Sequence, residues 1–211
     1  GAIDTCFGTN GTVTTDITAD RDYSRALALQ SDGKIVVAGI SGYSATAANA
    51  DFTVVRYNTD GSLDTTFDGD GIVITDIGPG TNDDDYCRGM AIQPDGKIII
   101  GGRSFLSPTT YGLVAVRYNS DGSLDTTFDS DGKAQFEMPA IVEMYGFALQ
   151  SDGKILVAGR SFLNGVFTGL IVRFNSNGSL DTSFGVGGST TASVSGIFSL
   201  ALQPDGKIVA S

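Results

Sequence analysis

The stretch RGMAIQPDGKIIIGGRSFLSPTTYGLVAVRYNSDGSLDTTF, residues 88–128, decides the fold, because the rest of the chain repeats it with variations. Its first phrase, AIQPDGKIIIGG, returns in similar form at Ala28, Ala148 and Ala201. Its second phrase, RYNSDGSLDTTF, returns at Arg56 and Arg173, and the fragment GAIDTCF stands at Gly1. We therefore expect tandem copies of one unit, with the first residues falling in the middle of a copy.

The unit is about sixty residues long. The turn aspartates of the first phrase, Asp32, Asp95, Asp152 and Asp205, are 63, 57 and 53 residues apart. Periods of this size are typical of arrays and propellers, in which each unit is one supersecondary element that buries its apolar face against its neighbours.

Composition and charge exclude several classes of protein. The 211 residues carry a net charge of -11, which opposes binding to nucleic acid phosphates or to anionic lipid. Because of this charge, we expect no nucleic acid partner. No apolar run approaches the roughly 18 residues of a membrane span, so we expect no membrane insertion. With 41% hydrophobic residues, the 29 glycines indicate turns between strands and not disorder.

The supply of chemically reactive side chains is small. The chain has no histidine, which removes the usual general base, zinc ligand and triad imidazole. Its two cysteines, Cys6 and Cys87, lie outside the repeat pattern, and we expect two unpaired thiols.

One unit reads as four strands. The segments 25–30 and 34–39 are apolar on both alternating faces and flank the turn SDGK, so they form a hairpin buried on both sides. Further strands are expected over 51–58 and 71–77, and later copies of the fourth, such as AQFEMP from Ala134, alternate polar and apolar residues. Inner strands buried on both faces and a last strand exposed to solvent on one face favour a propeller blade, with the first strand near the axis. A β-solenoid is the rival, but its shorter rungs have no room for three hairpins.

The phrases ALQPDGKIVA and LDTTFDGDG, at a sixty-residue step, resemble the delta-60 repeat of bacterial proteins. The resemblance spans the chain and implies a β-propeller of largely unknown function, secreted or exposed at the bacterial surface. It brings no catalytic residues.

We therefore predict an all-β fold of four-stranded antiparallel blades, in one repeat domain over 1–211 with about 3.75 blades. The expected parts are an outer strand over 11–17, blade units over 25–77, 87–138 and 145–194, and a partial blade over 197–211. Such a ring is incomplete. It either closes through the N-terminal strand, continues in further blades, or associates with another chain.

The two ends of the blades should differ in role. The hairpin turns and the link LDTTF repeat almost unchanged at one end, whereas the loops at the other end differ and should hold any ligand site. The repeated aspartates and arginines are predicted to form structural ion pairs, because near-identical copies cannot all be one active site.

Aromatic rings beside carboxylates in the differing loops suit sugar or peptide recognition. The predicted ligand-binding residues are Asp22, Tyr23, Tyr43, Asp85, Tyr86, Tyr111 and Tyr145. The alternative is that these tyrosines cap the inner strands.

A run of acidic residues found in one copy only indicates a possible calcium site, because hard oxygen ligands in a loop suit that ion. Its predicted ligands are Asn82, Asp83, Asp84 and Asp85, with Asp76 nearby. The spacing differs from that of the twelve-residue calcium loop, and a solvated loop is the alternative.

The leading function is an extracellular, non-enzymatic binding or scaffolding module that presents its loops to a glycan or protein. One alternative is a hydrolase or lyase that uses the carboxylates of Asp22, Asp85 and Glu143. The other is a purely structural module of a surface protein.

Overall fold

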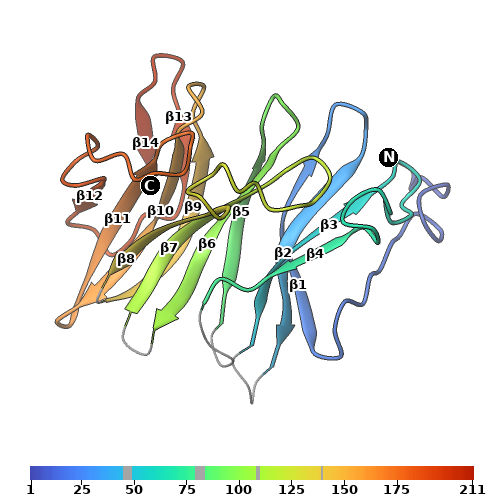
Figure 1. Ribbon diagram of the computed structural model, residues 1–211, viewed down its shortest axis with the longest axis horizontal. Coiled ribbons are helices and arrows are strands. Elements are labelled where there is room, and N and C mark those ends of the chain that lie inside the picture. The colour runs from blue at the N-terminus through green and yellow to red at the C-terminus, as the bar shows by residue number, and fades with distance from the viewer. Residues whose placement is uncertain (45–48, 79–83, 108–109, 139) are drawn as a thin grey trace.

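The computed structural model of the protein describes residues 1–44, 49–78, 84–107, 110–138 and 140–211. It is built from four antiparallel sheets, which we call blades 1 to 4 (Figure 1). Within the described ranges, no helix is long and apolar enough to cross a membrane.

Three blades have four strands and the last has two. Blade 1 contains β1 (Arg21–Leu29), β2 (Ile35–Tyr43), β3 (Asp51–Tyr57) and β4 (Ile72–Thr75). Blade 2 contains β5 (Tyr86–Ile92), β6 (Ile98–Ser107), β7 (Thr110–Tyr118) and β8 (Lys133–Met138). Blade 3 contains β9 (Ile141–Leu149), β10 (Ile155–Leu163), β11 (Val166–Phe174) and β12 (Ser189–Ala192). Blade 4 contains β13 (Leu200–Leu202) and β14 (Ile208–Ala210).

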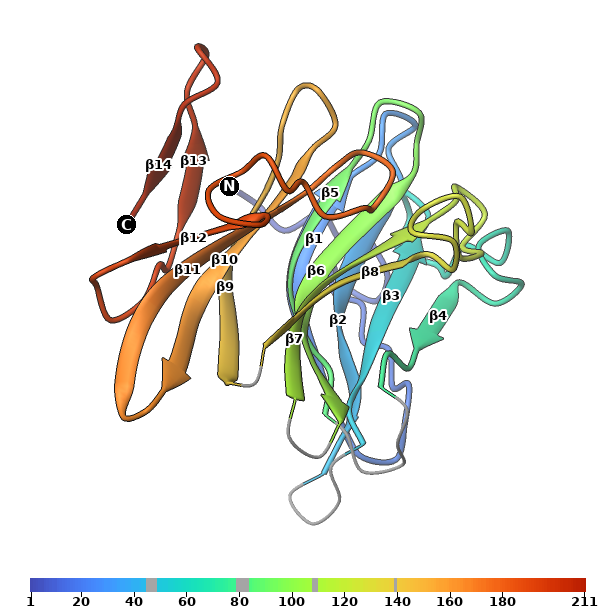
Figure 2. The same ribbon diagram turned by 60° about the vertical axis from the view of Figure 1, so that its left-hand side comes forward.

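The strands of each blade lie in chain order, and the first strands come together. β1 contacts β5, β5 contacts β9, and β9 contacts β13, so the first strands line an axis while β4, β8 and β12 lie outermost. Figure 2 shows the blades fanning out around this line. The predicted β-propeller of four-stranded antiparallel blades is confirmed.

The first two strands of each blade pair through the predicted tight turn. In blade 2, Gly96 takes a φ of 85°, and the side chain of Asp95 accepts a hydrogen bond from the backbone N–H of Lys97. The other three blades have the same Asp-to-Lys contact and the same positive φ at the turn glycine. The composition of the turn therefore fixes the pairing register.

Cores form between adjacent blades. Apolar side chains on one face of a blade pack against apolar side chains on the facing side of the next blade. Val36 and Val54 of blade 1, for example, belong to one core with Ile100 and Val116 of blade 2. A second core joins blades 2 and 3, and a smaller one joins blades 3 and 4. Stability therefore comes from neighbour-to-neighbour contacts.

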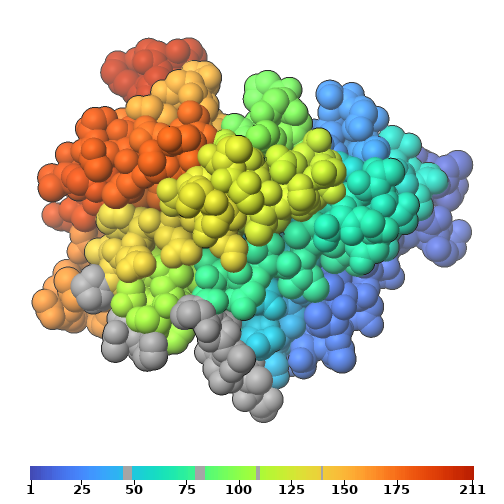
Figure 3. Space-filling model, in the orientation of Figure 1, coloured from blue at the N-terminus to red at the C-terminus, as the bar shows by residue number. Residues whose placement is uncertain are grey.

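The repeated charges are structural, as predicted. In blade 2, Asp125 is buried and accepts hydrogen bonds from Arg117 Nε at 2.7 Å and Lys97 Nζ at 2.6 Å. The Arg117 guanidinium also lies 4.6 Å from the centre of the Phe128 ring and donates to the carbonyl of Ser176 in the next blade. The link segments of successive blades adjoin one another over the face seen in Figure 3, where the backbone N–H of Asp129 donates to the carbonyl of Asn177.

Two expectations about the N-terminal end were wrong. Segment 11–17 makes only isolated bridges, at Thr12, and belongs to none of the four described sheets. An outer strand pairs with the third strand of its blade, and among the described residues no such strand lies beside this segment. β1 is not buried on both sides, since Leu27 is 64% exposed and Leu29 67% exposed. The described chain therefore has fourteen strands, one fewer than expected.

The two thiols are unpaired, as predicted. Cys6 is exposed and Cys87 is buried between blades, where burial raises the pKa of the Cys87 thiol to about 12. Cys87 therefore behaves as a core residue and not as a nucleophile.

Candidate functional site

The differing loops gather at one end of the molecule. In Figure 1 the turns between the first two strands of each blade lie at the upper end, and β2, β6 and β10 run from them toward the lower end. Most of the predicted ligand-binding residues belong to this lower, variable end: Asp22, Tyr23, Asp85 and Tyr86 lie at or just before the starts of β1 and β5, Tyr43 ends β2, and Tyr111 lies at the start of β7. Tyr145 lies in the middle of β9.

Four of the predicted tyrosines are joined by ring contacts across blades 1 and 2. Tyr23 and Tyr43 lie edge to face with ring centres 5.7 Å apart, and Tyr43 and Tyr86 likewise at 6.3 Å. Arg103 then bridges Tyr86, at 4.3 Å, to Tyr111, at 5.9 Å. We call Tyr23, Tyr43, Tyr86, Arg103 and Tyr111 the aromatic row.

The middle of the aromatic row is partly buried. Desolvation raises the pKa of Tyr86 to about 12, and the nearby Asp84 carboxylate adds to the rise. The Tyr86 hydroxyl donates a 3.1 Å hydrogen bond to Asp84 Oδ2, while Asp84 Oδ1 accepts from the backbone N–H of Ala50. Tyr23, at the blade 1 end, is 36% exposed. The row thus offers apolar ring faces flanked by polar groups.

Tyr145, the fifth predicted tyrosine, lies in a different group on blade 3. Its hydroxyl donates to Glu143 Oε2, which also accepts from Arg160. Its ring packs 4.9 Å from Phe198, and Arg160 reaches over Phe167 at 4.3 Å. The structure therefore joins four of the five tyrosines in one row and leaves Tyr145 outside it.

Asp22 and Asp85 occupy equivalent positions and make the same backbone contact. Asp22 accepts from the N–H of Ile17 at 2.9 Å, and Asp85 accepts from the N–H of Ile77 at 2.8 Å. Asp22 also accepts from Thr18 and from the N–H of Gly42. Both carboxylates therefore hold the segment that precedes their own blade.

Hydrogen bonding lowers the pKa values of the Asp22 and Glu143 carboxyl groups. Desolvation alone would raise the pKa of Asp22, but its hydrogen bonds from Ile17, Thr18 and Gly42 lower it overall. The pKa of Glu143 is lowered, chiefly by the Tyr145 hydroxyl and also by Arg160. Both groups are ionised at neutral pH, and neither is held in the protonated form that a general acid requires.

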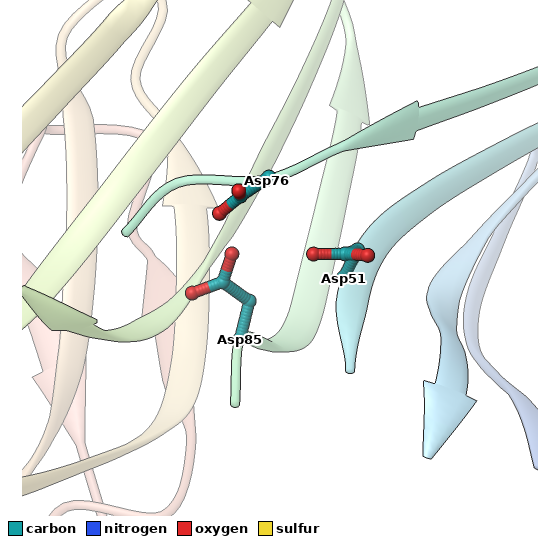
Figure 4. A group of neighbouring side chains, drawn as sticks. All are labelled: Asp51, Asp76 and Asp85. Atoms are coloured by element: carbon teal, nitrogen blue, oxygen red, sulfur yellow. The ribbon is translucent and has the colours of Figure 1, made fainter. Parts of the chain in front are cut away.

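A cluster of three carboxylates lies between blades 1 and 2. Asp51 begins β3, Asp76 follows β4 and Asp85 precedes β5, and Figure 4 shows their side chains facing one another. One oxygen from each lies within 4.8 Å of the others, with Asp85 buried, Asp51 half-buried and Asp76 exposed. Carboxylates gathered in this way suit a hard divalent cation.

This cluster differs from the calcium ligands predicted from the acidic run. Asp85 belongs to both sets, but Asp84 is engaged with Ala50 and Tyr86. Asn82 and Asp83 lie outside the described residues.

Sequence reasoning did not select Arg103 or Asp51. Arg103 begins the phrase RSFL, which recurs at Arg160, and each guanidinium lies 4.3 Å from the centre of an aromatic ring. Asp51 stands where the other copies have Gly112 and Thr168. A repeated arginine and a carboxylate unique to one copy were the available signals.

Comparison with known proteins places the repeats in one family. The family model described as "Domain of unknown function (DUF5122) beta-propeller" matches residues 30–67, 93–128 and 150–184. Each matched range runs from the first hairpin turn of a blade to the phenylalanine that ends its LDTTF-type link. No curated protein sequence matches the chain.

Among solved structures, the chain is similar to the endo-arabinase from Bacteroides thetaiotaomicron VPI-5482. The TM-score is 0.44 at 10% sequence identity, and the alignment covers 93% of this chain and 69% of the arabinase chain. A similarity this distant carries no argument about activity.

Proposed function

The chain belongs to the DUF5122 β-propeller family, and from that premise we propose that it is an extracellular, non-enzymatic binding module whose aromatic row holds a carbohydrate. The observation that carries the proposal is the continuous contact of Tyr23, Tyr43 and Tyr86 across two blades. Sugar rings stack their C–H faces on aromatic rings while their hydroxyls bond to charged and polar edges.

Arg103 supplies the polar edge that such a ligand needs. Its guanidinium is held between Tyr86 and Tyr111, and Asp84 lies beside the Tyr86 hydroxyl. A donor and an acceptor therefore lie beside the ring of Tyr86, which favours a hydroxyl-rich ligand over an apolar one.

The carboxylate chemistry favours binding over hydrolysis. The hydrolase alternative requires one protonated and one ionised carboxyl group. The pKa values of Asp22 and Glu143 are both lowered, and Asp85 bonds to the backbone of Ile77. These three carboxylates serve contacts inside the protein.

The resemblance to the delta-60 repeat supports a secreted or cell-surface location in bacteria, which fractionation of the native host would test.

A glycan array followed by calorimetry with the best glycan tests this proposal. We expect Tyr23→Ala and Tyr111→Ala, at the two ends of the row, each to weaken binding about tenfold, which corresponds to about 1.4 kcal/mol for one lost stacking contact. Phe167→Ala is the matched control, because Phe167 is an exposed ring in the equivalent hairpin of blade 3.

Binding that survives both tyrosine changes would contradict the proposal. If no glycan binds and a protein partner is captured through the same row, the ligand class is wrong but the surface is right. If neither binds, the purely structural module becomes the better description.

We also propose that the carboxylate cluster binds calcium. The oxygens of Asp51, Asp76 and Asp85 converge from three segments, and a divalent cation would offset the repulsion among three like charges. The cation would tie blade 1 to the start of blade 2, which links its binding to folding stability.

Thermal unfolding with calcium and with a chelator tests this second proposal. At a calcium concentration about a hundredfold above Kd, we expect the midpoint to rise by roughly 5–10 °C. Asp76→Asn should abolish the rise without unfolding the protein, because Asp76 is exposed. Asp20→Asn, an exposed carboxylate outside the cluster, is the control and should leave the rise unchanged. A midpoint that ignores calcium in the wild-type protein would refute the site.

A further inference from the structure

The inner strand of each four-stranded blade carries one bulged residue. In blade 2 the register of β5 with β6 shifts between Cys87 and Gly89, so Arg88 between them has no partner on β6. Arg25 of β1 and Tyr145 of β9 are passed over in the same way. A bulge redirects the side chain of the extra residue, and bulges are frequent beside functional sites.

The bulged position is the same one in every copy of the repeat. It stands five residues before the glutamine that precedes the inner hairpin turn, which gives Phe198 as its counterpart in blade 4. The hairpin phrase that follows hardly changes between blades, whereas this position changes in charge and in size. The contacts that build a blade therefore do not dictate which residue stands there, and the position can serve a ligand.

The side chains at this position follow one another around the axis. β1 contacts β5, β5 contacts β9, and β9 contacts β13. Burial raises the pKa of Cys87, and the charges of Arg25 and Arg88 both reach that thiol and oppose the rise. Burial also raises the pKa of Tyr145, where the charge of Arg88 opposes it, and the Tyr145 ring lies 4.9 Å from that of Phe198. We call Arg25, Arg88, Tyr145 and Phe198 the axial group.

A cavity of about 270 Å³ adjoins the axial group. Its lining includes Arg88, Tyr145 and Phe198, with Gly89 and Gly146 between the larger side chains. Arg88 and Tyr145 belong to blades 2 and 3, each of which packs against a neighbouring blade on both sides. Small-molecule sites measure roughly 300–1,000 Å³, so a cavity of this size suits one small ligand.

The two arginines of the axial group form no ion pair with an acidic side chain among the described residues. The ion pairs in that part of the chain use other cations. Arg25 lies 5.2 Å from the centre of the Tyr23 ring instead, and Arg88 is exposed. Two guanidinium groups on neighbouring strands, each without a carboxylate, attract an anion from solution.

The rings of the axial group are held beside these charges. The Tyr145 hydroxyl donates to the Glu143 carboxylate, which is paired with Arg160 at 2.7 Å. Glu143 is therefore occupied within blade 3, and the Tyr145 ring is fixed next to Phe198. Fixed aromatic faces beside a cation suit a ligand that has both a flat ring and a negative charge.

We propose that the axial group binds a small carboxylate that carries a ring, with the carboxylate on the two arginines and the ring against Tyr145 and Phe198. The planar guanidinium matches the two oxygens of a carboxylate, and the aromatic faces match the face of a ring. A uronic acid and an aromatic acid such as benzoate share this chemistry. The site uses none of the residues of the aromatic row, so it does not rest on the carbohydrate proposal.

Calorimetry with galacturonate, benzoate and galactose tests this site. We expect a carboxylate to bind and galactose, the neutral counterpart of galacturonate, not to bind. The tighter of the two carboxylates identifies a sugar or an aromatic ring as the ligand. Arg25→Gln and Arg88→Gln should each weaken binding about tenfold or more, and Phe198→Ala about tenfold. All three residues are exposed, so the variants should unfold at the wild-type temperature.

Arg21→Gln is the matched control, because Arg21 is exposed in the same strand as Arg25 but lies outside the axial group. It removes the same charge and should leave binding unchanged. The proposal is overturned if neither carboxylate binds, if galactose binds as tightly as galacturonate, or if Arg21→Gln weakens binding as much as Arg88→Gln. Tyr111→Ala should also leave binding unchanged. A loss of binding in that variant would place the carboxylate on the aromatic row and overturn the axial site.

Discussion

At the scale of single residues, the repeated charges show how one sequence phrase serves two blades. Asp125 accepts from Lys97 and Arg117 within its own blade, while Arg117 reaches the Ser176 carbonyl of the next. Asp64 and Asp181 repeat the two-cation arrangement. A buried carboxylate with two cations is costly to break, because removing it leaves positive charge unpaired.

These carboxylates should make stability depend on acid. Burial alone would raise the pKa of Asp125, but hydrogen bonds from Lys97 and Thr127 and the charge of Arg117 bring it well below 3.8. A lowered pKa in the folded state contributes stability above the unfolded value, and that contribution is lost as pH falls through the folded value. We therefore expect the urea midpoint to fall progressively below a pH of about 4.

Asp125→Asn should cost about 3 kcal/mol at neutral pH and flatten the acid response. Asp152→Asn is the control, because that exposed turn carboxylate accepts a hydrogen bond from the backbone N–H of Lys154, and its loss should cost less than about 1 kcal/mol. If the urea midpoint of Asp125→Asn falls with pH as steeply as that of the wild type, other groups cause the loss of stability in acid.

At the scale of elements, the inner hairpin of each blade is shaped by a bulge and a glycine. The register of β1 with β2, of β5 with β6 and of β9 with β10 shifts near the middle of each pair. A Cβ at Gly39, Gly102 or Gly159 would lie 1.9, 2.2 or 1.8 Å from a carbonyl oxygen of the inner strand. The last glycine of the phrase therefore permits close approach of two backbones.

Gly159→Ala should destabilise the protein by about 1–3 kcal/mol, because the obstructing atom is the backbone oxygen of Glu143 and cannot swing away. Gly196→Ala is the control, since its new Cβ would meet side-chain atoms of Phe198 and Arg160 at 3.2 Å or more. Thermal unfolding of both variants measures the difference. Equal midpoints would mean that the strand can shift to absorb the methyl group.

At the scale of the whole molecule, the blades form an arc whose two ends differ. Blade 1 exposes Leu27 and Leu29, and blade 4 exposes Val209. Blade 2 contributes to two cores, one with blade 1 and one with blade 3. Stability in such an array comes from contacts between neighbouring blades.

The sequence by itself determined the blade. The repeat spacing, the Asp-Gly turns and the two apolar faces predicted antiparallel blades around an axis, because these features depend on neighbours within about sixty residues. The phrase around Asp125 was also correctly interpreted as structural, since each copy meets the same surroundings. Local pattern is sufficient where every blade repeats the same contacts.

Only the tertiary structure decided which residues meet at the ends and between blades. Segment 11–17 has the pattern of a strand but lacks a pairing partner, and Leu29 has the pattern of a core residue but lacks a covering blade. Arg103 joins the aromatic row, and Asp51 meets Asp85, through packing of blade 1 on blade 2. Such contacts depend on the relative placement of two sheets, and no local periodicity encodes that placement.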